Sequence, residues 1–328
     1  MLSRRDLIAA SATGLVAAGA GLLPSARAQT VKKPVHIIVG FPAGGGTDIA
    51  TRILAERLRG PYAATILVEN KPGAGSRLAA ESVKNAEPDG ATILSTPEFV
   101  ITLYPSSFKS LSYDPVRDFA PIAPVYRSML CFNIGPMVPD SVKTLSDFVQ
   151  WCKANPTQAN FATTSAGGTP HFIGVMLANE AKTAINAVHY RGGAPALQDL
   201  VGGHIAASVN PVSEIMSQAK GAIRMLAVTG SKRSPFLPDV PTMHEAGYNV
   251  VLDTWFGLFA PARTPPEIVQ ALNAQLLEIS RSKEMAEAWA KIGAEPHHQT
   301  PAQFAETVKA DVQRWAAVVK ASGFVALE

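Results

Sequence analysis

Residues 35–58 constrain the fold more than any other stretch of this chain. Residues 35–39, VHIIV, are an apolar run rich in β-branched side chains, which indicates a buried strand. The next apolar residues recur at helical spacing: Ile49, Ile53, Leu54 and Leu58. Between strand and helix lies FPAGGGTD, with Thr47 and Asp48 at the expected N-cap. This order predicts one unit of an α/β fold.

The glycine-rich loop of this unit has two interpretations. The first-turn N–H groups of a helix lack intrahelical partners, and the helix dipole is positive at that end. Three consecutive glycines at 44–46 would let an anion such as a carboxylate approach these groups closely. The alternative is that the glycines only form a tight turn between strand and helix.

Length and charge limit the classes of function. A chain of 328 residues predicts about two domains. The net charge is +3, and residues 1–28 supply +2 of it, because Arg4, Arg5 and Arg27 outnumber Asp6. No basic stripe favours nucleic acid as a partner. The histidines show no metal-ligand spacing with the cysteines, so we expect no metal. We expect no cofactor either.

The N-terminus resembles an export signal. Residues 3–8, SRRDLI, are similar to the twin-arginine motif, and an apolar run follows at 7–23. Residues 26–28, ARA, fit a cleavage site, so we expect a signal peptide at 1–28 and a periplasmic protein that begins near Gln29. A membrane anchor is the alternative interpretation of the apolar run.

Cys131 and Cys152 are the two cysteines of the chain. Cys131 lies in an apolar, strand-like run and Cys152 in a predicted helix. We expect two buried free thiols, although an oxidising compartment also permits a disulfide.

Further along the chain, predicted strands alternate with predicted helices, which indicates parallel sheets with crossover helices. The predicted strands are 64–69, 91–95, 161–163, 188–190, 205–209 and 224–229. Two longer extended runs, 122–134 and 252–260, are candidates for segments that pass between two domains.

A second strand, glycine-rich loop and helix occur at 161–179. The loop is 164–171, TSAGGTPH, and its Pro170 suits a first helical turn. Two anion-receptive helix N-termini, one per domain, could face each other across a cleft, which favours the functional interpretation of both loops.

The motifs of this chain resemble those of one family over essentially the whole chain after residue 28. They include FPAGGGTD, ENKPGAG, EPDGATIL, YDPVRDFAPIA, NFATTSAGGTPH, VHYRGGAPALQDLVGGHI and WFGLFAPARTP, in that order. Together they resemble the Bug family, the periplasmic solute-binding proteins of tripartite tricarboxylate transporters.

The resemblance implies an α/β, type II periplasmic-binding-protein fold. Two α/β domains would be joined by two crossover strands, with a ligand cleft between them. Domain 1 would hold residues 31–128 and 253–328, and domain 2 residues 129–252. The resemblance further implies a non-enzymatic receptor of the Venus-flytrap type, which binds a small carboxylate and has an inner-membrane permease as partner. The ligand could be a di- or tricarboxylate, an acidic amino acid or an aromatic acid.

In this family the ligand carboxylate is held by the two strand-to-helix loops, largely through main-chain N–H groups. With neighbouring segments, the predicted ligand-binding residues are Phe41, Pro42, Ala43, Gly44, Gly45, Gly46, Thr47, Asp48, Ser76, Arg77, Thr96, Glu98, Thr164, Ser165, Ala166, Gly167, Gly168, Thr169, His171, Arg191, Gly192 and Asn210.

Several positions depart from the family pattern and bear on the ligand. Arg77 is either a surface charge or a second carboxylate clamp. Glu98 would repel a simple dianion but suit a ligand with an ammonium or hydroxyl group, and Phe99 could stack on an aromatic acid; either side chain could also point away. Asn210 stands where aspartate is frequent, and Ala43 where proline is common.

Other functions fit the sequence less well. Ser165, His171 and Asp48 could form a hydrolase triad, but the serine lacks the nucleophile-elbow pattern. The glycines at 44–46 lack both the dinucleotide pattern and a Walker lysine. A second function that the sequence allows is that of a periplasmic sensor subunit for a signalling partner.

We expect Trp255 and Phe256 to belong to the core rather than to the cleft.

Overall fold

The computed structural model describes residues 31–218, 221 and 223–328. The signal peptide predicted at 1–28 lies outside these ranges. Within them, no helix combines the length and the apolar character that a membrane crossing requires.

The strands follow the order β2-β1-β3-β9-β4-β7-β5-β6, with β10 and β8 paired to β4. In the first half, β1 (Val35–Val39) is parallel to β2 (Ile66–Asn70) and to β3 (Thr92–Pro97). In the second half, β5 (Asn160–Thr163) is parallel to β6 (Asn186–His189) and to β7 (Ala207–Pro211). Parallel pairing follows from the helices that connect these strands.

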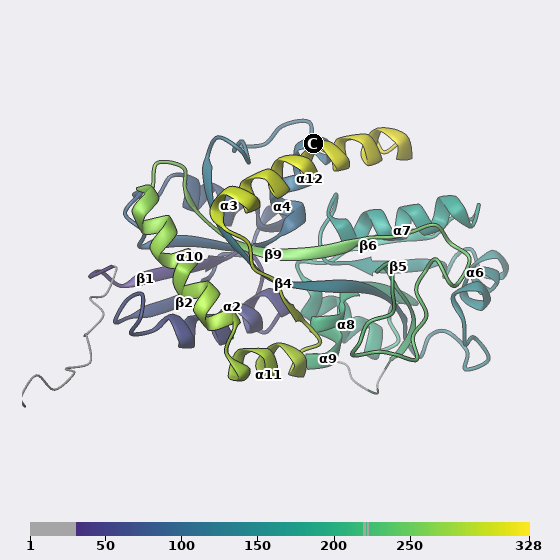
Figure 1. The fold of residues 1–328 in the computed structure, drawn as a ribbon. Coiled ribbons are helices and arrows are strands. Elements are labelled where there is room, and N and C mark those ends of the chain that lie inside the picture. Colours follow the sequence, from purple (N-terminus) through teal and green to yellow (C-terminus); the bar gives the residue numbers. More distant parts are fainter. Residues whose placement is uncertain (1–30, 219–220, 222) are drawn as a thin grey trace, which may run out of the picture.

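Two long strands join the halves. β4 (Phe119–Ile134) pairs with β9 (Asp253–Pro261) over residues 119–129 and with β7 over residues 130–134. Figure 1 shows both strands running between the two halves. β8 (Arg224–Val228) and the short β10 (Glu295–Pro296) also pair with β4. The type II architecture with two crossovers, expected at 122–134 and 252–260, is confirmed.

Helices cover the faces of both halves (Figure 1). Those of the first half are α2 (Gly46–Leu58), the 3-10 turn η1 (Ala74–Ser76), α3 (Arg77–Lys84), α4 (Glu98–Thr102) and α5 (Tyr104–Ser107). Those of the second are α6 (Leu145–Ala154), α7 (Thr169–Glu180), α8 (Gly193–Val201) and α9 (Val212–Gln218).

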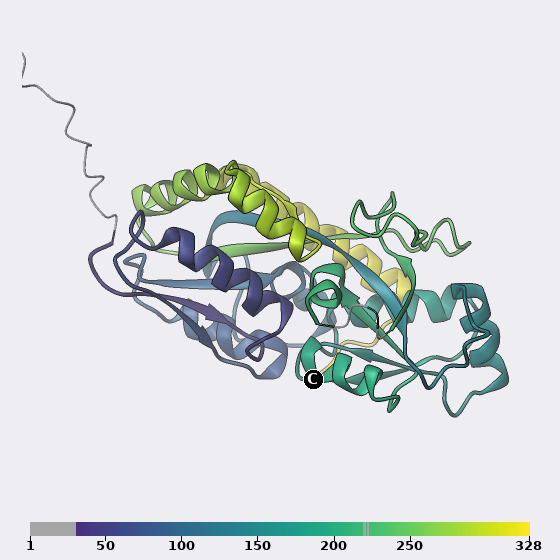
Figure 2. The ribbon, with the colours of Figure 1, turned by 90° about the horizontal axis from the view of Figure 1, so that it is seen from below.

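The C-terminal helices line one side of the molecule (Figure 2). They are α10 (Pro266–Ser280), α11 (Lys283–Lys291) and α12 (Pro301–Ser322). α12 reaches the second half, where the Trp315 ring lies 5.9 Å from that of Phe172 on α7. The chain therefore returns to the first half and still contacts the second.

The start of α2 corrects the sequence-based expectation. Its N-cap is Gly45, in an extended conformation, and the helix begins at Gly46. Thr47 and Asp48 therefore lie in the first turn and not at the N-cap, so the main-chain N–H of Gly46 is one of the donors without a partner inside the helix. Pro170 does lie in the first turn of α7, as expected.

One buried apolar cluster extends through both halves, and a further cluster lies in each half. Cys131 and Cys152 are buried as free thiols. Trp255 packs against Phe304, with ring centroids 4.9 Å apart, which agrees with a place in the core.

We predict that Gly174→Ala destabilises the second domain. Gly174 lies on α7 against β5, and an added Cβ would lie 2.0 Å from the fully buried ring of Phe161. Overpacking of this kind costs about 1–3 kcal/mol. Chemical denaturation of the purified protein measures it. Alanine is the better helix former by about 1 kcal/mol, so a rise in the free energy of unfolding would contradict the contact.

Candidate functional site

A small cavity lies between the two halves. The first domain contributes the loop before α2, the start of α4 and part of β9: Phe41, Pro42, Gly45, Gly46, Thr47, Pro97, Glu98, Phe99, Thr254 and Phe256. The second contributes the starts of α7, α8 and α9 with their flanking segments: Leu130, Thr164, Thr169, Pro170, Gly193, Ala194, Pro211 and Glu214. Its volume is about 40 Å³, enough for a few water molecules.

Three helices of eight residues or more begin at this cavity. They are α2, α7 and α8, whose first residues Gly46, Thr169 and Gly193 all line the wall. Each brings main-chain N–H groups that have no partner within the helix, and the positive end of its dipole. Within the described chain the lining contains no lysine or arginine. Attraction of an anion here therefore rests on main-chain groups and hydroxyls.

Glu214 of the second domain already binds the first loop. Its Oε1 accepts the main-chain N–H of Gly46 at 3.1 Å, and its Oε2 accepts Nδ2 of Asn210 at 2.9 Å. The carboxyl also lies against α8, where a Cβ on Gly193 would come within 1.8 Å of Oε2. Burial raises the pKa of Glu214, and these two hydrogen bonds oppose the rise. Glycine at 193 is therefore what leaves room for this carboxyl group.

Glu98 of the first domain makes the reciprocal contact. Its Oε1 accepts the hydroxyl of Thr169, the first residue of α7, at 2.5 Å. Burial raises the pKa of Glu98 to about 8. Each predicted loop is thus bonded to a glutamate of the opposite domain, and these contacts hold the cleft closed.

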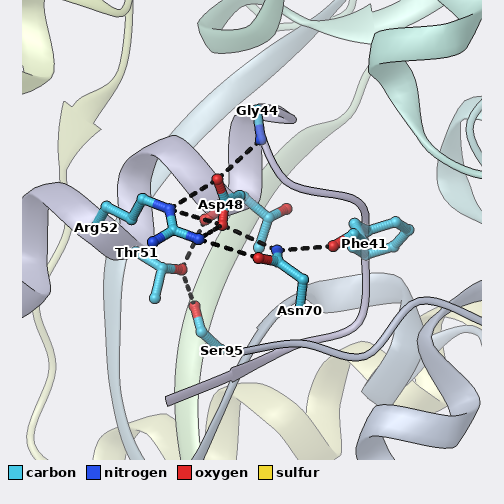
Figure 3. Close-up of polar contacts among 8 residues, drawn as sticks. Phe41, Gly44, Asp48, Thr51, Arg52, Asn70 and Ser95 are labelled. Atoms are coloured by element: carbon cyan, nitrogen blue, oxygen red, sulfur yellow. Dashed lines mark hydrogen bonds and ion pairs between the residues drawn. The ribbon is translucent and has the colours of Figure 1, made fainter. Parts of the chain in front are cut away.

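Asp48 organises the first loop from behind the cavity. Its carboxylate accepts the N–H of Gly44 at 2.9 Å, Nδ2 of Asn70 at 2.9 Å and Nε of Arg52 at 3.0 Å (Figure 3). Burial alone would raise its pKa, but these three bonds lower it below the usual value. Asn70 also donates to the carbonyl of Phe41, which fixes the start of the loop.

His171 supports the second loop in a similar way. Its Nδ1 accepts the N–H of Gly167 at 3.1 Å. Burial, with a contribution from His189, lowers the pKa of His171 to about 4, so the ring is neutral near pH 7. The neutral ring is an acceptor that shapes the loop.

A larger cavity, about 680 Å³, adjoins the first. Arg77 lines it, with its guanidinium 3.9 Å from the centre of the Phe108 ring and its Nε bonded to the carbonyl of Ala74. The structure therefore places Arg77 near the cleft rather than on a remote surface. Predicted residues that line this cavity are Phe41, Pro42, Ser76, Arg77, Thr164, Ser165, Ala166, Arg191 and Gly192.

The remaining predicted residues divide between the small cavity and positions behind it. The small cavity is lined by Phe41, Pro42, Gly45, Gly46, Thr47, Glu98, Thr164 and Thr169. Neither cavity is lined by Ala43, Gly44, Asp48, Thr96, Gly167, Gly168, His171 or Asn210, all of which belong to the described chain.

Sequence reasoning missed Glu214, Gly193 and Phe256 as parts of this wall. Phe256 was expected in the core; it is buried, yet it also lines the cavity. Trp255 and Phe256 project to opposite faces of β9, as neighbours on a strand must. The alternation of side chains along a strand was the sequence signal that could have assigned the two residues to different faces, one toward the core and one toward the cavity.

Comparisons with known proteins identify the family of this chain. The model of the tripartite tricarboxylate transporter family receptor matches residues 50–324. Protein BugT of Bordetella pertussis (strain Tohama I) is 33% identical over 314 residues, which cover 94% of this chain and 96% of BugT.

Solved structures extend the likeness to the fold. Rpa4515 of R. palustris, solved with adipate, is 29% identical with a TM-score of 0.84 and covers 88% of this chain and 97% of its own. MatC of Rhodopseudomonas palustris, solved with bound malate, is 28% identical with a TM-score of 0.81, and the match covers 87% of this chain and 98% of MatC. The chain therefore belongs to the tripartite tricarboxylate transporter receptor family, whose members are periplasmic solute-binding proteins and not enzymes.

Proposed function

We propose that this protein captures a small carboxylate-bearing ligand between its two domains and presents it to an inner-membrane permease. The observation that carries the proposal is that the two glycine-rich loops, one from each domain, meet at one cavity with the N-termini of α2 and α7. Relatives of the same fold hold adipate and malate, which supports a carboxylate as the anchoring group.

Donors for such a group come from both loops. Thr47 lies in the first turn of α2 and Thr164 in the loop before α7, and both line the cavity. A hydrogen bond from N–H or O–H to a charged carboxylate contributes about 1.5–3 kcal/mol. Four such bonds, less the ordering cost, reach about −8 kcal/mol, which is micromolar affinity.

The transport step requires two conformations. The ligand enters an open cleft, binds one loop and is enclosed when the other domain closes over it. We place the domain boundaries at 128/129 on β4 and at 252/253 just before β9, where the two connections pass between the halves. The closed shape is what the permease recognises.

Delivery to the periplasm follows from residues 1–28. We propose that SRRDLI directs export through the twin-arginine route and that cleavage after Ala28 releases the receptor. N-terminal sequencing of the exported protein tests the cleavage.

A ligand screen tests the proposed function. The protein is unfolded, dialysed and refolded to remove co-purified ligand, then titrated with C4–C6 dicarboxylates, citrate, amino acids and aromatic acids. We expect at least one carboxylate to bind with micromolar affinity by calorimetry and to raise the melting temperature. Binding of none of them would contradict the assignment to carboxylates.

A further inference from the structure

Two buried acidic side chains stand in the wall of a cavity that receives an anion. Glu98 is 1% exposed and Glu214 is 4% exposed, and they come from opposite domains. Burying a carboxylate is costly unless a donor or an opposite charge compensates it. Among the described lining residues no lysine or arginine provides that charge. A ligand with only carboxylates would bring no positive charge that lets these two side chains ionise.

Burial raises the pKa of Glu214, but the groups around its carboxyl favour the ionised form. Both of its oxygens already accept hydrogen bonds, from the N–H of Gly46 and from Nδ2 of Asn210. The carboxyl also lies where α2 and α8 begin, next to Gly46 and Gly193, so two helix dipoles favour its negative charge.

Glu98 is bonded to the other domain through one oxygen. The hydroxyl of Thr169 donates to Oε1, and the main-chain N–H of Glu98 itself also favours the ionised carboxyl. From α12, Asp311 opposes its ionisation and Arg314 favours it. Burial is the largest influence, so Glu98 holds its proton near pH 7 while the cavity is empty. A cation that enters the cavity would allow it to ionise.

The rest of the wall is apolar and aromatic. Phe41 and Phe99 meet edge to face, with ring centroids 6.2 Å apart, and Phe256 lines the same cavity. Aromatic faces attract ammonium groups, most strongly where water is excluded. These walls favour an uncharged ligand body, and the adjoining cavity of about 680 Å³ provides the room that the 40 Å³ of this one does not.

We propose that the ligand carries a protonated amine beside its carboxylate, and that Glu98 and Glu214 hold the ammonium from the two domains. This inference rests on the proposed function, because the carboxylate still binds the loops. The ligand class is a zwitterionic amino acid with an uncharged side chain. The three N–H donors of the ammonium match the acceptors that the two glutamates offer. Glu98 and Glu214 therefore act as specificity-determining residues.

Matched ligand pairs test this directly. Calorimetry at pH 7 compares L-leucine with 4-methylpentanoate and L-phenylalanine with 3-phenylpropanoate, each pair differing only in the amine; adipate and malate complete the panel. We expect at least one amino acid to bind tenfold or more tighter than its matched acid. A matched acid or a dicarboxylate that binds as tightly as the amino acids would overturn the inference and leave the proposed function standing. Binding of nothing in the panel would overturn both.

Variants give a second readout. Both Glu98→Gln and Glu214→Gln preserve the shape of the side chain and remove the charge; the first keeps the oxygen that accepts from Thr169, and the second keeps one of two accepting oxygens. We expect each to weaken amino-acid binding tenfold or more while the affinity for the matched acid stays equal or rises. The exposed control Glu284→Gln should change neither. Equal losses for both members of a pair would show a merely structural role and overturn the proposal.

The number of protons released on binding shows whether Glu98 is ionised or protonated in the complex. If the ammonium pairs with Glu98, that carboxyl ionises on binding, so amino-acid binding at pH 7 releases protons and the measured enthalpy depends on the ionisation enthalpy of the buffer. The Glu98→Gln variant should lose this release. If instead a protonated Glu98 donates to the ligand carboxylate, no protons are released, and that result would overturn the inference.

Discussion

Gly46→Pro is expected to lower the affinity for the tightest-binding carboxylate by about 100-fold and to leave the fold intact. Gly46 is the first residue of α2, where proline is well tolerated. The preceding Gly45 has φ −74° and ψ 164°, which a residue before proline adopts without strain. The substitution removes the N–H that binds the Glu214 carboxyl and places a ring beside it. Calorimetry measures the loss, and circular dichroism checks the fold.

Gly46→Ala is the matched control for this experiment. It keeps the N–H and adds only a Cβ, 3.3 Å from Cβ of Glu214, so most of the affinity should remain. If the proline variant folds and binds as tightly as the wild type, the N-terminus of α2 is not part of the site. If the alanine variant loses as much affinity as the proline variant, bulk and not the missing donor explains the loss.

The loops were predictable because their signals are local. An apolar run, small residues and a helical repeat stand next to each other at 35–58 and again at 161–179. The start of β1 and its end at Val39 agree with the sequence pattern. The expected N-cap was displaced because glycine also caps a helix, and Gly45 takes that position with no side-chain hydrogen bond.

The missed parts of the site depend on long-range packing. β7 ends at Pro211 and α9 begins at Val212, so no polar linker marked the helix that carries Glu214. Glu214 and Gly46 are 168 residues apart in the sequence, and the local pattern around neither residue indicates that they are in contact. In the sequence, Glu98 stands out only as a departure from the family pattern. That it and Glu214 line one cavity follows from closure of the two domains.

These two glutamates connect ligand binding to the closed shape. Each ties its own domain to a helix N-terminus of the other, Glu98 to Thr169 and Glu214 to Gly46. A ligand ammonium placed between the domains would strengthen both ties, because the contacts then include opposite charges. The ligand that best satisfies the two carboxyl groups is therefore the one that best stabilises the closed form.

The ligand-free protein is expected to lose stability between pH 5 and pH 8 through Glu98. The folded state holds this proton up to a pKa of about 8, whereas the unfolded chain releases it near the ordinary value of 4.5. The stabilisation from this proton is thus fully present below pH 4.5 and is lost as the pH rises to 8. Glu98→Gln cannot ionise, and its Oε1 can still accept the hydroxyl of Thr169.

The variant should therefore match the wild type near pH 5 and exceed it at pH 8. We expect a difference of about 3 kcal/mol in the free energy of unfolding, roughly 6 °C in melting temperature. Thermal unfolding from pH 5 to pH 9 measures it, with Glu284→Gln as the exposed control. Parallel curves for wild type and Glu98→Gln would contradict a protonated Glu98. A saturating amino acid whose ammonium pairs with Glu98 should cancel the difference, since the ionised carboxylate then has its counter-charge.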